Sequence, residues 1–222
     1  MALTTYGEIK TAVADWLERT DLTTVIAADF FPIAQSKMYY GDKGYGGLAD
    51  VDPLRIRAMV SSGALTPSST GAVTITSGVA SGWLEFIELT PSTNYAQSMN
   101  YMDPWSFRKK TDALSSTVAP QFIYTIEGGT LYVAPLNTGT INAVWYQKFT
   151  ALSGASDTDW IITNAPQVYL FGCLAEAAAY LQDERLAQFR AQFAGAIKGL
   201  NMNDQAQRAS GSRPVARPRA VV

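Results

Sequence analysis

The side chains that could support catalysis in this sequence are few, because the chain has no histidine. Its absence excludes the serine and cysteine triads that use an imidazole base, and it excludes the commonest zinc and iron sites. Cys173 is the single cysteine, so no internal disulfide can form. The apolar sequence around Cys173 favours a buried, inert thiol over a nucleophile. We therefore expect no bound cofactor and no metal centre.

Two pairs of carboxylates have spacings that could suggest the acid and base of a glycosidase. Glu85 and Glu88 lie three residues apart in an expected strand and should point to opposite faces of it. Asp157 and Asp159 lie in a polar turn, where they could instead hold a cation, but the full spacing of a calcium loop is missing. The glycine cluster at 44–47 has no following Lys-Ser/Thr and no preceding strand, which disfavours a phosphate loop. These patterns predict a protein that is not an enzyme.

Aromatic residues are frequent in the middle of the chain. They could fill a core or an interface, or they could form a platform that binds sugars. A carbohydrate-binding or depolymerising module is therefore kept as an alternative function. The aromatic residues are Trp83, Phe86, Tyr95, Tyr101, Trp105, Tyr124, Tyr132, Trp145 and Tyr146.

Composition and charge are those of a globular protein with a basic end. The chain has 222 residues, of which 47% are hydrophobic and 16% charged. No apolar run reaches the roughly 18 residues of a membrane span, and the N-terminus lacks the pattern of a signal peptide, so we expect a cytosol-like compartment and no membrane. Residues 1–200 carry 13 basic and 18 acidic side chains, whereas 201–222 carry four arginines and one aspartate. The acidic body argues against general nucleic-acid binding.

Helices are expected at both ends of the chain. Thr5 and Glu8 have the spacing of a capping box, which predicts a helix from Tyr6 to Arg19. After a connection at 20–28, Asp29 is expected to cap a second helix that ends at Tyr40, before the glycine-rich stretch 41–47. Near the other end, Asn164 and Asp183 are expected to cap a third and a fourth helix, and 201–222 is expected to be extended.

Between the helices, the period of the apolar residues changes to two, which is typical of strands. Glu127-Gly128-Gly129-Thr130 predicts a tight hairpin turn, because each glycine can adopt positive φ. Asp103 and Pro104 predict the start of a short helix that ends near Ala113. The expected strands are Leu54 to Val60, Ala72 to Thr76, Trp83 to Leu89, Ser98 to Tyr101, Phe122 to Glu127, Thr130 to Ala134 and Ile141 to Phe149.

The predicted fold class is α+β. We expect a helical bundle formed by 1–48 and 161–200, a large inserted antiparallel β domain at 49–160, and an extended basic tail at 201–222. The stretch 164–200 is apolar on nearly all sides, and one chain has few helices to cover it, so we predict that it packs against a neighbouring subunit. The residues assigned to this packing are Tyr169, Cys173, Leu174, Ala178, Leu181, Phe189 and Phe193.

Several segments, in the same order along the chain, resemble the head-to-tail adaptor proteins of tailed bacteriophages. They are TYGEIKTAVADWLERTDLT, DFFPIAQSKM, YMDPWSF, PQFIYTIEGGTLYVAPL, WYQKFTALS and WIITNAPQVYLFGCLAEAAAYLQDE. The similarity covers residues 4 to about 190, and the glycine-rich 41–47 and the segment 61–82 depart from it.

The resemblance implies a virion structural protein in the neck between capsid and tail, assembled in the host cytoplasm. Its implied partners are the portal protein, further copies of itself in a ring of twelve, the tail nozzle and tail-fibre proteins. DNA would pass through the lumen without specific binding, and the acidic body suits such a channel. We further expect the arginines of the tail to dock onto acidic portal or neighbouring-adaptor surface. They are Arg208, Arg213, Arg217 and Arg219.

Overall fold

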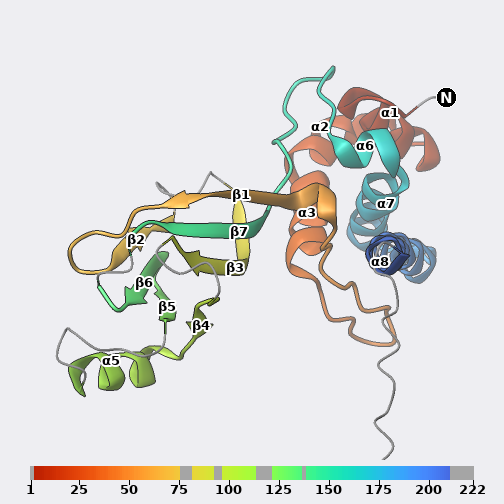
Figure 1. The fold of residues 1–222 in the computed structure, drawn as a ribbon. Helices are drawn as coiled ribbons and strands as arrows, with labels where there is room; N and C mark the ends of the chain where they lie inside the picture. Colours follow the sequence, from red (N-terminus) through yellow and green to blue (C-terminus); the bar gives the residue numbers. More distant parts are fainter. Residues whose placement is uncertain (1–2, 76–81, 93–96, 114–121, 137–138, 211–222) are drawn as a thin grey trace, which may run out of the picture. The chain divides into compact units, whose positions relative to one another are not determined.

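The computed structural model describes residues 3–75, 82–92, 97–113, 122–136 and 139–210 (Figure 1). The chain divides into two compact units. The first unit comprises Met1–Ala58 and Thr150–Val222, and the second comprises Met59–Phe149. Helices dominate the first unit and strands the second, so the α+β class is confirmed. The limits of the second unit lie inside the expected limits of the β insertion.

The first helix of the helical unit forms as the sequence predicts. Helix α1 (Tyr6–Trp16) begins at a capping box, in which the Glu8 amide donates to Thr5 Oγ1 over 3.3 Å. The Thr5 amide in turn donates to Glu8 Oε2 over 3.0 Å. These bonds satisfy amide groups that the first turn of a helix leaves without partners. The helix ends at Trp16, earlier than the expected Arg19, because Glu18 adopts a positive φ of 52° just after the C-cap Leu17.

The connection expected at 20–28 is helical, so that prediction and the expected cap at Asp29 are wrong. A 3₁₀ turn (Thr20–Leu22), α2 (Thr23–Val25) and a π-helical turn (Ile26–Phe30) run directly into α3 (Phe31–Tyr40). Leu22, Ile26 and Phe30 recur every four residues and are all buried. Their burial stabilises helical backbone where the local sequence gives only weak helix signals.

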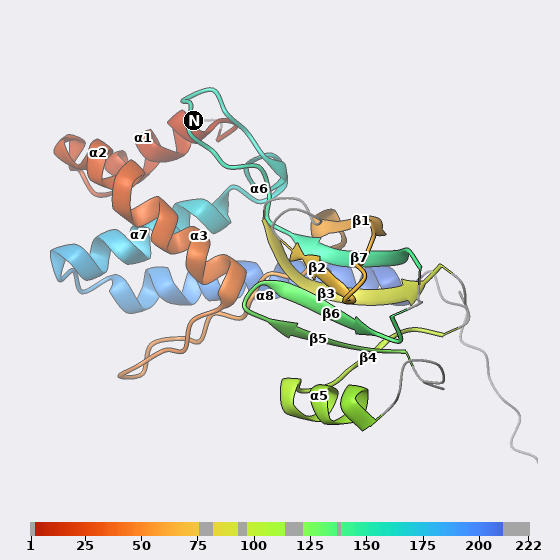
Figure 2. The same cartoon turned by 90° about the vertical axis from the view of Figure 1, so that its left-hand side faces the viewer.

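The C-terminal helices differ from expectation at both ends. Asp159, and not Asn164, acts as a cap: its Oδ1 accepts from the Ile162 amide over 2.8 Å at the start of α6 (Trp160–Asn164). Helix α7 (Gln167–Leu181) follows Pro166 and ends where Gln182 takes a left-handed conformation. Helix α8 (Leu186–Ser210) continues beyond residue 200, so the expectation of an extended chain is wrong for 201–210. Figure 2 shows α7 and α8 beside each other, with α3 packed on α7.

Two sheets pack face to face in the second unit. One contains β1 (Val60–Leu65), β7 (Ile141–Gln147) and β3 (Trp83–Pro91), in that order. The other contains β2 (Ala72–Thr74), β6 (Thr130–Ala134), β5 (Ile123–Glu127) and β4 (Asn100–Tyr101). Both sheets contribute to a common core that includes Leu65, Leu89, Leu131, Val133 and Trp145. The described strand pairs are antiparallel except β4 with β5, which is parallel.

The two strongest local predictions in the β unit are confirmed. Gly128 and Gly129 have φ values of 53° and 78° and join β5 to β6 in register. Helix α5 (Pro104–Ala113) begins with Asp103 Oδ1 accepting from the Ser106 amide over 3.0 Å. Phe107 of this helix is buried against Ile123 and Ala134, so α5 covers part of the second sheet.

Candidate functional site

The candidate acids and bases hold local structure together. Asp157 Oδ2 accepts from the amides of Ser153 and Gly154 at 2.8 and 2.7 Å, and these hydrogen bonds lower the pKa of its carboxyl group. Asp159 Oδ2 accepts from the hydroxyl of Tyr169 over 2.6 Å, besides capping α6. Each carboxylate therefore has a structural partner. Within the described part of the chain, no three His, Cys, Asp or Glu side chains form a group that could hold a metal ion.

The remaining candidate catalytic groups are two glutamates of β3 and the cysteine of α7. The expectation that Glu85 and Glu88 point to opposite faces is wrong: the register of β3 shifts between Phe86 and Glu88, so the two glutamates lie opposite Tyr146 and Val144, on one face of the sheet. Glu88 accepts from the Ser98 hydroxyl over 2.8 Å. Cys173 is fully buried, and burial raises the pKa of its thiol far above the usual range. Because the thiolate is the nucleophilic form, this cysteine is inert in the folded protein.

Most of the aromatic residues of the β unit pack in its interior. Trp145 is buried, and Trp83, Phe86 and Tyr124 are half-buried against the same core, while Tyr132 packs beside α5. Tyr146 is half-buried, and Tyr95 lies outside the described residues. Tyr101 and Trp105 are different: they are 60% and 71% exposed. Among the described aromatic residues considered for a sugar-binding platform, Tyr101 and Trp105 are therefore the two whose rings are exposed.

The residues assigned to subunit packing lie inside a single chain. Leu181 is half-buried and the other six are buried. The inference that one chain cannot cover α7 is wrong, because α1, α3 and α8 of the same chain pack on it. Gly172 allows the closest approach: a Cβ there would lie 3.0 Å both from Ala34 of α3 and from the Phe193 ring of α8. Contact of these seven residues with a neighbouring subunit stays a prediction.

A cluster of charged side chains joins three helices to the chain that follows α3. Lys37 Nζ lies 2.7 Å from Glu176 Oε1 and 3.4 Å from Asp42 Oδ2. Arg190 Nη2 lies 2.9 Å from the same Asp42 oxygen, and Arg190 Nε donates to the Ala49 carbonyl over 2.8 Å. Because Arg190 is buried, its loss would remove the partner of the Ala49 carbonyl and would leave Asp42 with the more distant Lys37. The cluster fixes both ends of the segment between 42 and 49.

That segment is part of a hairpin, here called the glycine-rich hairpin (residues 41–52). Its two strands pair through Asp42 and Val51, whose amide and carbonyl groups bond each other at 2.8 and 2.9 Å. Further along, Asp50 accepts from Lys43 Nζ over 2.9 Å and from the Gly44 amide over 2.8 Å. At the tip, Tyr45 is 83% exposed. The hairpin therefore has an ordered base and carries an aromatic ring at its end.

The chain after the hairpin is extended, but its partner is a helix. Leu54 and Ile56 are buried, which explains the period of two that predicted a strand at 54–60. The prediction of a sheet strand there is wrong, because residues 54–56 belong to no sheet, a 3₁₀ turn (Arg57–Met59) follows them, and β1 begins at Val60. The Arg55 amide donates to Asn201 Oδ1 over 2.9 Å, and the Arg57 amide donates to Asp204 Oδ1 over 3.1 Å. Side chains of α8 thus satisfy the amides that a neighbouring strand would otherwise satisfy.

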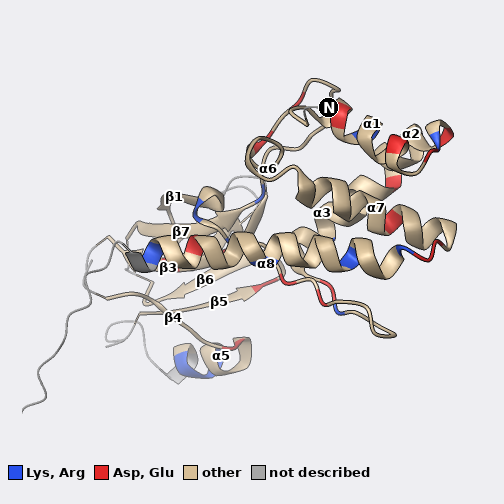
Figure 3. Cartoon of the chain, turned by 90° about the vertical axis from the view of Figure 1, so that its right-hand side faces the viewer, with Lys and Arg blue, Asp and Glu red and all other residues tan. Residues whose placement is uncertain are grey.

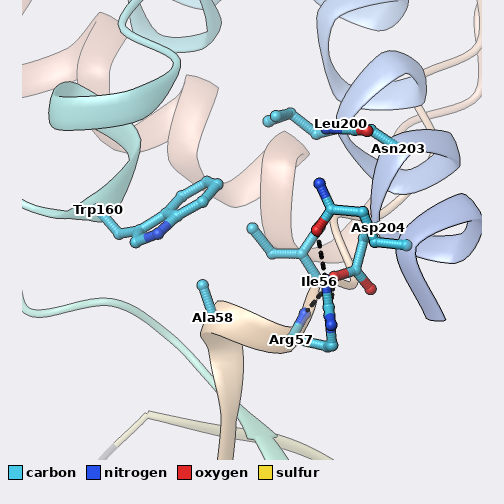
Figure 4. A pocket seen from close by; sticks show the side chains of 8 residues that line it. Ile56, Arg57, Ala58, Trp160, Leu200, Asn203 and Asp204 are labelled. Atoms are coloured by element: carbon cyan, nitrogen blue, oxygen red, sulfur yellow. Dashed lines mark hydrogen bonds and ion pairs between the residues drawn. The ribbon is translucent and has the colours of Figure 1, made fainter. Parts of the chain in front are cut away.

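A pocket of about 400 Å³ lies where this extended segment meets α6 and α8 (Figure 4). Ile56, Trp160 and Leu200 provide its apolar wall. Arg57 forms an ion pair with Asp204, with Arg57 Nε 2.9 Å from Asp204 Oδ1, and it also donates to Gln207. The remaining lining residues are Ala58 and Asn203. The pocket is therefore apolar on one side and polar on the other.

Asp204 holds the C-terminal part of α8 against the extended segment. Burial would raise the pKa of its carboxyl group, but hydrogen bonds from Arg57 and the charge of Arg208 outweigh burial and lower it. Arg208 Nη2 lies 2.7 Å from Asp204 Oδ2, one turn along α8 near its end (Figure 3). Arg208 therefore has a partner within its own chain, while Arg213, Arg217 and Arg219 lie outside the described residues.

The structure thus defines an α+β protein whose candidate catalytic groups are used to hold its fold, and whose described helices include none long and apolar enough to cross a membrane. The family described as SU10 adaptor protein matches residues 4–218. No curated protein matches the chain. The match spans nearly the whole sequence, and the chain belongs to this family of phage head-to-tail adaptors. The resemblance noted in the sequence is confirmed, and the protein is a structural component of a phage virion.

Proposed function

We propose that the chain assembles as a ring of twelve on the phage portal, extends the DNA channel below it, and offers its β unit to tail nozzle and fibre proteins. The mechanism is assembly, without catalytic turnover. Membership of the adaptor family is the observation that carries the proposal. The ring would lie in the neck of the virion after assembly in the host cytoplasm.

The surface of the helical unit supports ring formation. Large apolar side chains remain exposed on its helices even though its core is well filled, and such residues are enriched in protein interfaces. They come from α1, α3 and α7, so different surfaces of one copy could meet different surfaces of the next, as a ring requires. The exposed residues are Trp16, Ile33, Tyr40 and Tyr180.

The surface of α5 supports docking of a tail protein. Trp105 of this helix is more exposed than the nearby Tyr101, and the ammonium group of Lys109 lies 5.0 Å from the centre of the Trp105 ring. Arg108 pairs with Glu127 at the end of β5. Figure 3 marks the basic residues of this helix in blue. An aromatic ring among basic groups suits an acidic partner that also offers apolar surface.

The test is to mix the protein with the portal protein of the same phage and to image the product by electron microscopy. We expect a closed ring of adaptor on one end of the portal. A protein that stays separate from the portal at every concentration would overturn the proposal. A chain that ends at Ser210 keeps all of α8 and removes Arg213, Arg217 and Arg219. If it joins the portal as tightly as the full chain, these arginines have no role in docking.

A further inference from the structure

The helical unit has both a projecting group and a recess of suitable size for it. The projecting group is Tyr45 at the tip of the glycine-rich hairpin, and the recess is the pocket beside Trp160. Arg190, near the start of α8, binds the base of the hairpin, whereas the pocket is lined by Leu200, Asn203 and Gln207. Ten residues of helix separate the two places, about 15 Å along the axis. Figures 2 and 3 both show the hairpin projecting near the beginning of α8, away from its C-terminal end. The hairpin of one copy therefore points away from its own pocket.

The hairpin is built to present Tyr45 to another molecule. Its base is anchored through Asp42 and Ala49, and its arms are joined by Lys43 and Asp50. Gly46 and Gly47 both have positive φ, and a Cβ on either would meet no other atom within 4 Å. These glycines therefore suit the turn through their positive φ, and the ring of Tyr45 beside them is 83% exposed. Since the anchored arms lose little freedom on binding, Tyr45 can bind at a low entropic cost.

The pocket has the chemistry that a phenol requires. Ile56, Leu200 and Trp160 can contact the faces of an aromatic ring, and Figure 4 shows the indole of Trp160 opposite Leu200 and Asn203. Asn203 and Gln207 place amide groups at the edge, where they could bond a hydroxyl. A volume of about 400 Å³ lies in the range of cavities that bind small molecules. Tyr is among the residues that anchor interfaces in such pockets.

The charges around the two parts are complementary. The arms of the hairpin expose the carboxylates of Asp50 and Asp52 against one lysine, Lys43. The rim of the pocket exposes Arg57 and Arg208, while the Asp204 carboxylate between them is largely buried. Opposite net charges favour approach of the hairpin to the rim.

We propose that Tyr45 of one copy inserts into the Trp160 pocket of the adjacent copy and so links neighbouring subunits of the ring. The inference rests on the proposed ring, for which it supplies a specific contact. A knob and a different hole on the same subunit form a heterologous interface, which repeats from copy to copy and closes if the rotation closes. The contact is made by the helical unit alone.

Cysteine cross-linking on the assembled portal complex tests the contact directly. The chain's own cysteine is buried and raises no background. We expect a variant that carries both Tyr45→Cys and Asn203→Cys to form chains of disulfide-linked subunits when oxidised on the portal, and each single variant to form none. Absence of these products, although electron microscopy shows rings of the double variant, would refute the contact and leave the proposed ring intact. Absence of rings from the unchanged protein would overturn both.

Substitution provides an independent measurement. Tyr45→Ala should raise the concentration needed for half-assembly on the portal about tenfold or more, as loss of a central anchor does. Ala58→Trp should do the same, because Ala58 is exposed at the pocket and the larger ring would fill it. Tyr101→Ala is the matched control, since Tyr101 is also an exposed tyrosine but belongs to the β unit, which the proposed contact does not involve. Equal assembly by Tyr45→Ala and Tyr101→Ala would contradict the inference.

Discussion

The crossing of α3, α7 and α8 at Gly172 gives a prediction with an internal control. A methyl group at Gly172 would lie 3.0 Å from the Cβ of Ala34 and 3.0 Å from Cε2 of Phe193, closer than such atoms normally approach. At Gly195 of α8, a Cβ would meet nothing within 4 Å. Replacing glycine by alanine inside a helix gains about 1 kcal/mol at either place. Because this gain in helix propensity is common to both variants, the difference between their free energies of unfolding measures packing alone.

We expect Gly172→Ala to be less stable than Gly195→Ala by about 1–3 kcal/mol, the usual cost of an added methyl group in a filled core. Gly195→Ala should be more stable than the unchanged chain by up to about 1 kcal/mol. The measurement is urea unfolding followed by far-ultraviolet circular dichroism, which reports mainly on the helical unit, with equal m-values as the check on the comparison. Equal stability of the two variants would show that the three helices do not meet as closely at Gly172 as described.

Two further predictions concern buried groups. Cys173 should not react with a thiol reagent in the folded protein and should react fully in denaturant, because burial raises the pKa of its thiol; labelling of the native protein at the rate of a free cysteine would contradict this. In the folded protein the pKa of the Asp204 carboxyl group lies below its ordinary value of 3.8. The ionised carboxylate therefore contributes its full stabilisation above pH 3.8, and this stabilisation is lost as the pH falls through the lower pKa of the folded state. Asp204→Asn should abolish this step, measured as amide hydrogen exchange in the last turns of α8; an unchanged pH dependence in the variant would exclude Asp204 as its source.

The elements that sequence reasoning predicted well are those whose signals are local. The capping box of α1 lies within four residues, and the hairpin at 128–129 needs only two glycines between strands. The start of α5 likewise depends on Asp103 and its neighbours. In each case the residues that form the structure are adjacent in the sequence, so the pattern contains the whole cause.

The errors arose where the partner is distant. At 54–57 the alternation of buried residues is real, but side chains of α8 nearly 150 positions later replace the second strand. The pattern of α8 continues past residue 200 at helical spacing, but its inward positions there are the polar Asn201 and Asp204. An apolar period could not reveal a helix that is held by hydrogen bonds. The parallel pairing of β4 with β5 has no signature in either strand alone.

The candidate surfaces were predictable only in part. Cys173 was recognised as inert from its apolar neighbours, whereas the cover of α7 was not, because packing by α1, α3 and α8 depends on how the chain turns between them. The glycines of 41–47 indicate the end of a helix and disfavour a phosphate loop, but they do not by themselves indicate a hairpin. The signal in the sequence is Lys43 and Asp50, whose opposite charges pair across the two arms around Tyr45.

The two places at which the chain passes between the units have an evolutionary consequence. Val60 at the start of β1 lies opposite Tyr146 near the end of β7. Residues paired in this way have Cα atoms about 4.5–5.5 Å apart, so the β unit begins and ends at adjacent points. Recombination could exchange everything between them for another module, or for a short turn, without altering the path of the helices. Under the proposed function, such an exchange would let a phage lineage acquire a new tail while it keeps the same head.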